Sequence, residues 1–383
     1  MPAKVIDVAK ARTAGDLRDV VHRAVQALSE SRVVAFPTET IYGLAASALD
    51  EQAVEKLVQA KGRAAQHPFA LAVKSVDDAL DYVPDMPVLA QRLARRCWPG
   101  PLTLVLEVNR ESSLVDRLPA AIQQRVCPNG TLGLRVPASA LVIDALRLMT
   151  GPLALTSANQ TGGAEAVTAE EVMAEVGEQI DLVLDDGRCQ FGQASTVVQV
   201  TDNKIKILRQ GVISPGNLRR LGSLQILFVC TGNTCRSPMA EALARKILAD
   251  RLGCKVEEVE DRGFTIASAG IAAMNGGRAA LEAVDVLAEQ GLNLNEHISQ
   301  PLREPLIRQA DYVFTLTASH RHAILSQWPD AEDRVHVLSA EGEDVSDPIG
   351  GTRQMYAACA EQIGKMIETR IDQMDLTESV VVE

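Results

Sequence analysis

The residues from 224 to 252 constrain the fold more than any other part of the chain. They begin with LQILFVC, a continuous apolar run that is typical of a strand buried on both faces. A short loop follows, and MAEALARKILADRL then repeats apolar residues with the period of a helix. A buried strand, a tight loop and a helix in this order predict one unit of a parallel, doubly wound α/β sheet.

Strand and helix patterns alternate through the rest of this half of the chain. FTIASAG, DYVFTLT and RVHVLS have the composition of strands, and helical patterns lie near residues 277–290 and over residues 352–374. This alternation of strands and helices predicts further parallel strands in the same sheet. The fold class predicted for this half is therefore a doubly wound parallel sheet with a phosphate-binding loop after its first strand.

That loop reads CTGNTCRS and has the chemistry that phosphate binding needs. Its backbone N–H groups would point inward at the positive end of a helix, which favours an anion and a thiolate at Cys230. A thiolate attacks phosphorus, and Arg236, six positions on, offers a planar fork to two phosphoryl oxygens. Gly232 and Asn233 can take positive φ, which a tight loop needs, and Ser237 can hydrogen-bond the thiolate.

Asp347, in the segment EDVSDPIGG, is the candidate general acid that protonates the leaving group. An Asp-Pro-x-Gly-Gly sequence is typical of a surface loop that could reach over the phosphate site. Asp-Pro alone is more often only a turn. Together with the loop at Cys230, it indicates a cysteine-dependent hydrolase of phosphoesters or phosphoamides.

On CTGNTCRSPMAE and the later Asp-Pro, residues 224 to about 375 resemble the low-molecular-weight phosphotyrosine phosphatase family. The resemblance implies that Cys230 is the nucleophile, that Arg236 clamps the transition state, and that Asp347 acts first as acid and then as base. It implies a phosphorylated protein as substrate and no metal. The residues expected to form the phosphate loop and set its specificity are Thr231, Gly232, Asn233, Thr234, Cys235 and Ser237.

Two positions bear on the substrate. Tyrosine-specific members tend to carry a bulky aliphatic residue where this chain has Thr234, and aromatic residues where it has Ile349-Gly350. Thr234 resembles the protein-arginine phosphatase branch, so we place phosphoarginine ahead of phosphotyrosine. Arsenate reductases of the same fold use two later relay cysteines. Here only Cys254 and Cys359 follow, the latter in the last helix pattern, so no such relay is expected.

Cys235 has two interpretations. It is a small buried residue, or it is a resolving thiol that forms a reversible disulfide with Cys230 under peroxide. The seven cysteines are odd in number and scattered, which argues against a disulfide framework and for a reducing compartment, and they have no zinc spacing. They are Cys97, Cys127, Cys189, Cys230, Cys235, Cys254 and Cys359.

The length of 383 residues is too great for one ordinary core and predicts two domains. Charge separates the halves, because residues 1–220 carry 24 Lys and Arg against 25 Asp and Glu, and the remainder carries 14 against 25. ISPGNLRRLGS holds turn residues and no sustained apolar period. The predicted organisation is a domain over residues 8–214, a linker over 215–223 and a domain over 224–383.

The composition excludes several classes of protein. The chain has no run of about 18 apolar residues that could span a membrane, and its first residues lack a secretory signal. We therefore expect a cytoplasmic protein with no membrane partner. Neither half has the basic excess of a protein that grips nucleic acid, so strong direct nucleic-acid binding is not expected.

The first half alternates helical patterns with short apolar strands, which predicts a mixed, twisted sheet with helices. Helices are expected over residues 15–31, 50–61, 77–81 and 87–97. The expected strands lie in SRVVAFPTETIYGLAA, FALAVKS, PLTLVLEV, LGLRVP, DLVLDDG, STVVQV and KIKILR.

Cationic and small polar side chains next to turns mark a candidate ligand site in this half. Lys61 and Arg63 at a helix end could hold a triphosphate, and Arg135 and Arg209 end apolar strands. Each taken alone is more often a solvated charge. Collectively the blocks FPTETIYGLAA, KGRAAQHPFA, WPGPLTLVL, LGLRVP, LTSANQTGG, ASTVV and ILRQG resemble the threonylcarbamoyl-AMP synthase (YrdC-like) family over about residues 8–214.

This second resemblance implies that L-threonine, bicarbonate and ATP are joined into L-threonylcarbamoyladenylate with release of pyrophosphate. Mg²⁺ is expected on the phosphates of ATP, and a partner complex would transfer the group to tRNA. The residues implied to face ATP are Lys61, Arg63, His67, Thr131, Ser157, Asn159 and Arg209. Those implied to face threonine are Thr40, Arg135 and Ser195.

The chain departs from this second family at Ala64, Ala72 and Gln210, where many members have Pro, His and Pro. The change at Ala72 puts threonine affinity in question. Two other hypotheses stay open. The first half could bind nucleotide or RNA without synthesis and regulate the phosphatase, or two unrelated active domains could be fused only for co-expression.

Overall fold

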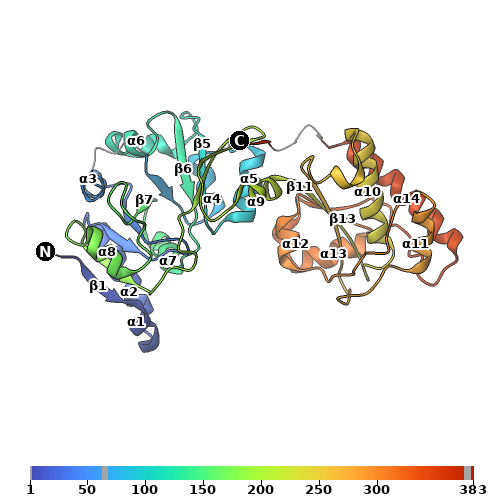
Figure 1. Ribbon diagram of the computed structural model, residues 1–383, viewed down its shortest axis with the longest axis horizontal. Coiled ribbons are helices and arrows are strands. Elements are labelled where there is room, and N and C mark those ends of the chain that lie inside the picture. The colour runs from blue at the N-terminus through green and yellow to red at the C-terminus, as the bar shows by residue number, and fades with distance from the viewer. Residues whose placement is uncertain (1, 63–67, 375–380) are drawn as a thin grey trace. The chain divides into compact units, whose positions relative to one another are not determined.

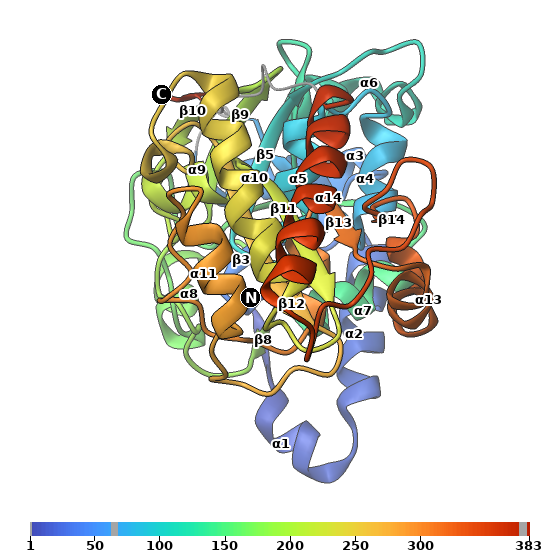
Figure 2. The ribbon, with the colours of Figure 1, turned by 90° about the vertical axis from the view of Figure 1, so that its right-hand side faces the viewer.

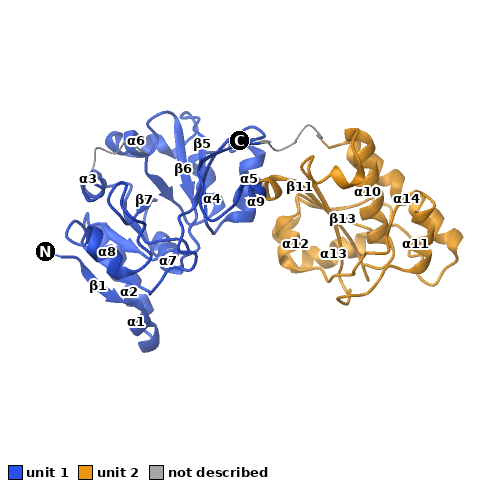
Figure 3. Cartoon of the chain, viewed as in Figure 1, with its two compact units in different colours: residues 1–218, 381–383 blue, residues 219–380 orange. Residues whose placement is uncertain are grey.

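The structure is a computed structural model that describes residues 2–62, 68–374 and 381–383. The chain divides into two compact units, one of residues 1–218 and 381–383 and the other of residues 219–380 (Figure 3). Each unit contains one sheet (Figure 1).

The first unit is built on an eleven-stranded mixed sheet with the order β1-β8-β2-β3-β7-β4-β6-β5-β9-β10-β15. Its strands are β1 Lys4–Asp7, β2 Val34–Phe36, β3 Gly43–Ser47, β4 Ala70–Ala72, β5 Leu102–Glu107, β6 Thr131–Arg135, β7 Leu153–Ser157, β8 Leu182–Asp185, β9 Thr196–Thr201, β10 Lys204–Arg209 and β15 Val381–Val382. The sheet contains both parallel pairs, such as β4 with β6, and antiparallel pairs, such as β3 with β7. This is the mixed sheet that the sequence predicts.

The helices of this unit are α1 Val8–Ala14, α2 Leu17–Ser29, α3 Glu51–Ala60, α4 Val76–Tyr82, α5 Val88–Cys97, α6 Ala120–Val126, α7 Ala140–Leu148 and α8 Ala169–Val176, with a 3-10 turn at Leu114–Arg117. Along α2, Val20, Ala24 and Leu28 recur at helical spacing and are buried in one cluster with Phe36 of β2 and Val142 of α7. Full burial of a Val or Leu side chain, such as Val20 or Leu28, stabilises the fold by about 1.5–3 kcal/mol. The apolar period of α2 therefore fixes which side of the helix lies on the sheet.

The second unit is built on a four-stranded parallel sheet with the order β12-β11-β13-β14. Its strands are β11 Leu224–Cys230, β12 Phe264–Gly270, β13 Tyr312–Thr315 and β14 Val335–Val337. Its helices are α10 Arg236–Leu252, α11 Leu281–Ala288, α12 Glu304–Gln309, α13 Ala318–Gln327 and α14 Arg353–Asp372, with 3-10 turns at Val256–Glu258 and Pro329–Ala331.

Apolar residues on both faces of β11 explain why this sheet is covered twice. Leu224, Ile226 and Phe228 are buried in a cluster with residues of α10, α11 and α14. Leu227 and Val229 point the other way, into a cluster with residues of α12 and α13. Figure 2 shows α10, α14 and α11 side by side on one face of the sheet. The continuous apolar run thus produces the doubly wound arrangement that the sequence predicts.

The segment expected to be a linker over residues 215–223 is instead largely helical, because α9 spans Pro215–Gly222. The Ser214 hydroxyl accepts a hydrogen bond from the Asn217 N–H at 3.3 Å, and Pro215 occupies the first helical position. Leu218 is fully buried. The segment has no sustained apolar period, but Ser214-Pro215 starts a helix here.

Two short strands lie outside the expected domain limits. β1 lies upstream of residue 8 and pairs in parallel with β8. β15, at the end of the chain, pairs in parallel with β10 of the first unit, where Lys204 is opposite Val381. The first unit therefore includes residues from both ends of the chain.

Candidate active sites

The Cys230 thiol lies where β11 ends and the loop of residues 230–237 begins. β11 is flanked by β12 and β13, so its carboxyl end lies at the switch point of the sheet, where α/β folds bind ligands. Cys230 is 3% exposed. Its Sγ accepts a hydrogen bond from the Asn233 N–H at 3.3 Å and lies 3.0 Å from the Ser237 Oγ. The Asn233 N–H is a donor that favours a negatively charged sulfur.

Asn233 holds the loop in its turn. Its φ is +53°, and its side-chain amide donates to the hydroxyls of Ser237 and Ser268, both at 2.9 Å. Its Oδ1 accepts from the Gln300 N–H at 2.9 Å. Positive φ was expected at Gly232 as well, but it occurs at Asn233 and not at Gly232. One left-handed residue closes the loop, and the Asn side chain offsets its strain with three hydrogen bonds, two of them buried.

Gly270, the last residue of β12, lies directly beneath the loop. A Cβ at this position would come within 2.5 Å of the Thr231 carbonyl oxygen and 2.9 Å of the Asn233 nitrogen. The Ile271 N–H donates to the Cys230 carbonyl at 2.9 Å, and the Ala272 N–H donates to the Thr231 carbonyl at 3.0 Å. The end of β12 therefore holds the loop through these two backbone hydrogen bonds and leaves no space for a side chain at Gly270.

Arg236 and Asp347 meet across the loop. Arg236 is the first residue of α10, its side chain is 6% exposed, and its Nη1 donates to the Val345 carbonyl at 3.2 Å. Its Nη2 forms an ion pair with Asp347 Oδ2. Cys230 thus begins the loop, and Arg236, near the end of the loop, is paired with Asp347.

Two histidines that the sequence analysis did not single out also hold the loop. His320, 4% exposed and in the first turn of α13, places its Nε2 2.9 Å from the Thr231 Oγ1. Burial and the nearby Arg236 lower the pKa of His320, which favours the neutral imidazole. His297 places its Nε2 2.8 Å from the Asn233 carbonyl. No local sequence signal marks these histidines, because both contacts depend on tertiary packing.

The remaining loop residues face α11 and α14. The Thr234 carbonyl accepts from the Ala280 N–H at 2.8 Å, just before α11 begins. The Cys235 Sγ lies 3.7 Å from the Thr234 hydroxyl and 3.4 Å from the Tyr356 hydroxyl. Burial raises the pKa of Cys359 in α14 to about 12, so that thiol stays protonated.

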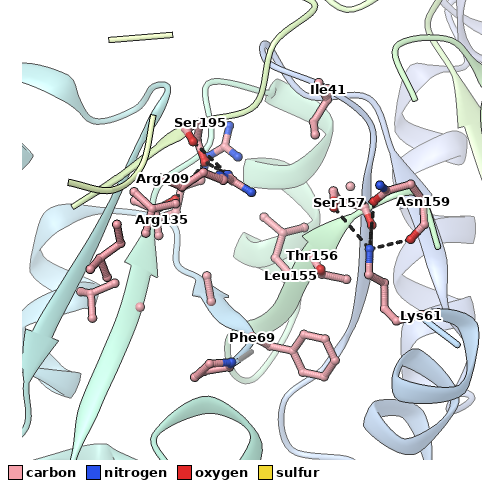
Figure 4. A pocket seen from close by; sticks show the side chains of 18 of the residues that line it. Ile41, Lys61, Phe69, Arg135, Leu155, Thr156, Ser157, Asn159, Ser195 and Arg209 are labelled. Carbon is pink, nitrogen blue, oxygen red and sulfur yellow. Dashed lines mark hydrogen bonds between the residues drawn. The ribbon is translucent and has the colours of Figure 1, made fainter. Parts of the chain in front are cut away.

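A cavity of about 580 Å³ in the first unit is the second candidate site. Figure 4 shows Lys61 with Ser157 and Asn159 on one wall, and Arg135, Ser195 and Arg209 on the opposite wall. The apolar residues Phe69 and Leu155 lie between the two walls. Cations on both walls suit a ligand with several negative charges, and the apolar floor suits a flat ring.

Lys61 follows the last turn of α3, which starts on the Asp50 cap. Its Nζ donates to the carbonyl oxygens of Ser157 at 2.9 Å and Asn159 at 2.5 Å, and lies 2.9 Å from Asn159 Oδ1. Burial, with a smaller effect of Arg209, lowers the pKa of Lys61 to about 8. Burial also lowers the pKa of Arg209. An anion bound in the cavity would therefore stabilise the positive charges of Lys61 and Arg209.

A buried ion pair supports the opposite wall. Arg135 Nη2 donates to Glu39 Oε1 at 2.7 Å and to the Thr40 hydroxyl at 2.9 Å. Glu39, which the sequence analysis did not single out, also accepts from the Ala138 N–H at 3.0 Å. Arg209 Nη2 donates to the Ser195 carbonyl at 2.9 Å and to its hydroxyl at 3.1 Å. These contacts fix both guanidinium groups at the cavity.

Seven of the predicted residues of the first half line this cavity, namely Lys61, Thr131, Arg135, Ser157, Asn159, Ser195 and Arg209. Thr40 is fully buried and reaches the site through its bond to Arg135. Arg63 and His67 lie outside the described residues, as does Ala64. Ala72 is buried at the end of β4.

Family models match both parts of the chain. The Sua5/YciO/YrdC model, described as telomere recombination, matches residues 26–211. The model described as low molecular weight phosphotyrosine protein phosphatase matches residues 225–379. The chain therefore belongs to both families, the first unit to the Sua5/YrdC family and the second to the low-molecular-weight phosphatases. It is bifunctional, with a nucleotidyltransferase-type and a hydrolase-type enzyme unit.

Individual relatives match each part separately. The threonylcarbamoyl-AMP synthase of Pyrococcus abyssi is 32% identical over 247 residues, which cover 61% of this chain and 69% of the relative. The corresponding Bacillus subtilis synthase is 34% identical, and the match covers 51% of this chain and 54% of the relative. The protein-arginine-phosphatase of Bacillus subtilis is 38% identical over 155 residues, which cover 39% of this chain and 97% of the relative.

A solved structure of a substituted Pyrococcus abyssi Sua5 is similar in fold. It is 21% identical, the match covers 82% of this chain and 98% of that chain, and the TM-score is 0.50. At this identity the likeness concerns the fold alone. Separately, across residues 2–62, 68–374 and 381–383, none of the helices is both long and apolar enough to cross a membrane.

Proposed function

We propose that the second unit is a cysteine-dependent protein phosphatase that removes phosphate from phosphoarginine. The observation that carries the proposal is the ion pair of Arg236, in the loop that begins at Cys230, with Asp347. The Cys230 thiolate attacks phosphorus, and the phosphorus–nitrogen bond to the guanidine breaks as Asp347 gives it a proton. Water, deprotonated by Asp347, then cleaves the phosphocysteine and releases inorganic phosphate.

The remaining loop residues support the phosphoryl group in this scheme. Arg236 holds two phosphoryl oxygens, and the backbone N–H groups of Thr231, Gly232, Asn233 and Thr234 surround the phosphate in an anion nest. Thr234 and the 38% identity to a protein-arginine-phosphatase favour phosphoarginine over phosphotyrosine. The hydroxyl of Thr234 is small enough to leave room for water beside the guanidine.

The test is release of phosphate from phosphoarginine and from phosphotyrosine by the whole chain, with Cys230→Ser as the blank. Faster, Cys230-dependent turnover of phosphoarginine is the expected result. Faster turnover of phosphotyrosine would move the unit to the tyrosine-specific branch.

We propose that the first unit makes L-threonylcarbamoyladenylate from L-threonine, bicarbonate and ATP. The support is the cavity with cations on two opposite walls. The threonine amine and bicarbonate condense to a carbamate with loss of water, and a carbamate oxygen attacks the α-phosphorus of ATP to expel pyrophosphate. The residues mainly position the reactants and neutralise charge. Lys61 and Arg209 would face the phosphates, and Mg²⁺ would enter on the nucleotide.

Arg135, Thr40 and Ser195 would face threonine, with Arg135 holding its carboxylate. A partner complex would then transfer the product to tRNA. We place both activities in the cytoplasm, where the free thiols of the described residues stay reduced. The test is pyrophosphate release that requires both threonine and bicarbonate. Nucleotide binding without that release would indicate the regulatory binding module instead.

A further inference from the structure

Glu39 is a buried carboxylate that lies behind one wall of the cavity in the first unit. Its side chain is 5% exposed, and it is not among the described residues that line the cavity. Its partner Arg135 does line the cavity. Replacing a buried ion pair by packed apolar side chains often leaves stability unchanged or raises it. Stability alone therefore does not account for this pair.

Both oxygens of the Glu39 carboxylate are occupied by donors of the protein. Oε1 accepts from Arg135 Nη2 at 2.7 Å, and Oε2 accepts from the Ala138 N–H at 3.0 Å. The Glu39 carbonyl accepts from the Phe191 N–H at 2.9 Å. Ala138 follows β6 and Phe191 precedes β9, so backbone from two separate segments holds Glu39. The position of its carboxylate is therefore fixed by the protein itself.

Thr40 provides the second acceptor for Arg135 Nη2, at 2.9 Å. The Thr38 hydroxyl donates its only proton to the Ile41 carbonyl at 2.6 Å. In its 2.8 Å contact with Thr40, Thr38 therefore accepts and Thr40 donates. The lone pairs of Thr40 Oγ1 remain for Arg135. Both N–H groups of Nη2 are thus directed at acceptors that are themselves held in place.

The rest of the Arg135 guanidinium is not held in this way. Its Nε is buried and has no hydrogen-bond partner among the described residues. A buried donor without a partner costs about 1–3 kcal/mol. The guanidinium is therefore held through Nη2 in a position that is not the best one for its own hydrogen bonds. Nη1 is the group that remains for a ligand in the cavity.

Glu39 also sets the charge of this wall of the cavity. Arg135 and Arg209 lie on the same wall, beside Ser195 (Figure 4). Burial lowers the pKa of Arg209, and although Glu165 opposes that effect, the positive charge of Arg135 adds to it. Glu39 offsets one of these two positive charges. Without Glu39, the wall would attract any small anion more strongly.

We propose that Glu39 is a positioning residue for the amino-acid substrate. It does not touch threonine, but it directs Arg135 at the threonine carboxylate and reduces the positive charge that would otherwise hold an unrelated anion there. The inference rests on the proposed synthase function of this cavity and adds a residue that acts through Arg135. A zwitterion needs this balance, because excess positive charge repels its amine.

The experiment measures the KM for threonine and the KM for ATP separately, from pyrophosphate release by the whole chain. Glu39→Gln removes the charge and keeps the shape, so the KM for threonine should rise about 10- to 100-fold while the KM for ATP stays within about threefold. Sulfate is the anion probe, and it should compete with threonine in Glu39→Gln at concentrations that leave the unchanged chain unaffected. A residue that only stabilised the fold would change neither the ratio of the two KM values nor the response to sulfate.

Two further variants separate the direction of Arg135 from the charge of the wall. Glu39→Asp keeps the charge but withdraws it by one methylene group, so it should raise the KM for threonine without creating competition by sulfate. It also carries the test if thermal unfolding shows that Glu39→Gln does not fold. In the Arg135→Gln chain, adding Glu39→Gln should change the KM for threonine by less than about twofold, because Glu39 acts through Arg135.

Asp181→Asn is the matched control, because Asp181 is a carboxylate of the same unit that accepts from the Val33 N–H at 2.9 Å. It should leave both KM values unchanged. An unchanged KM for threonine in both Glu39 variants would overturn the inference, as would equal rises in the two KM values or losses that add in the Arg135→Gln chain. Pyrophosphate release by the unchanged chain that does not need both threonine and bicarbonate would instead overturn the proposed function.

Discussion

Arg236 Nη2 forms an ion pair with Asp347 Oδ2, 111 positions later in the chain. The Arg236 side chain is 6% exposed and that of Asp347 is 42% exposed, so the pair links a buried side chain to a partly exposed one. Arg236 also holds the Val345 carbonyl, two residues before the acid. Arg236 therefore positions the segment that carries Asp347.

Replacing the acid should slow the chemistry without unfolding the unit. Asp347→Asn keeps the shape of the side chain but cannot protonate the leaving group, so we expect kcat to fall roughly 100- to 10,000-fold. The rate of phosphate release measures this fall in kcat. Asp333→Asn, an exposed carboxylate of the same unit, should be neutral. Equal rates for the two variants would show that Asp347 is only a turn residue.

Adding one methyl group beneath the loop should damage the phosphatase selectively. In Gly270→Ala the Cβ would meet the backbone of Thr231 and Asn233 at 2.5 and 2.9 Å, which displaces the donors around Cys230. We expect at least a 100-fold loss of turnover. Gly364→Ala in α14, where a Cβ meets nothing within 4 Å, should keep activity and stabilise the helix by about 1 kcal/mol. Full activity in Gly270→Ala would contradict the role given to the end of β12.

The second unit should lose stability in mild acid because of His320. Burial lowers its pKa, so the unfolded chain takes up the proton first as the pH falls below about 6.5. The stabilising effect of the neutral imidazole is complete above that pH and is lost as the pH falls toward the lowered value. The unfolding midpoint of His320→Asn should therefore depend less on pH between about 7 and 5. The exposed His322→Asn serves as the control and should keep the original slope.

The first unit should bind ATP more weakly at alkaline pH. Lys61 has a pKa of about 8 and loses its positive charge as the pH rises through that value. The KM for ATP in pyrophosphate release should therefore increase above pH 8. Lys61→Met should raise the KM roughly 10- to 100-fold at neutral pH and abolish this dependence. Lys56→Met, on the same helix, should behave like the unchanged chain. An alkaline rise in KM that persists in Lys61→Met would contradict the assignment.

The strand, loop and helix around Cys230 could be predicted from sequence because one apolar run and one helical period specify them locally. The contact between Cys230 and Ser237 follows from that local geometry. Asp347 was predicted from its Asp-Pro-x-Gly-Gly segment and from the family resemblance, but its pairing with Arg236, 111 residues away, could not be predicted locally. The contacts of His320 with Thr231 and of Glu39 with Arg135 depend on tertiary packing, and a single sequence contains no local signal for them.

The helix at residues 215–222 and the strand β15 were missed for different reasons. A helix that starts at Ser214-Pro215 is stable because Leu218 is buried in the core. Composition does not reveal that burial, so it suggested a linker. β15 has two residues and takes its strand form from pairing with β10, where Ile205 is opposite Val382. Val has a high strand propensity, but a run of two residues is too short to predict a strand without its partner.

The most direct test of the account is phosphate release from phosphoarginine by Cys230→Ser and Cys235→Ser side by side. The two thiols are 3% and 5% exposed and lie in the same loop, so each is a matched control for the other. The Cys235 variant can also be treated with peroxide and then a thiol, where loss of reversible inactivation would identify Cys235 as the resolving thiol. The account predicts that Cys230→Ser abolishes turnover and that Cys235→Ser retains it. Turnover that survives Cys230→Ser would contradict the central claim that Cys230 is the nucleophile.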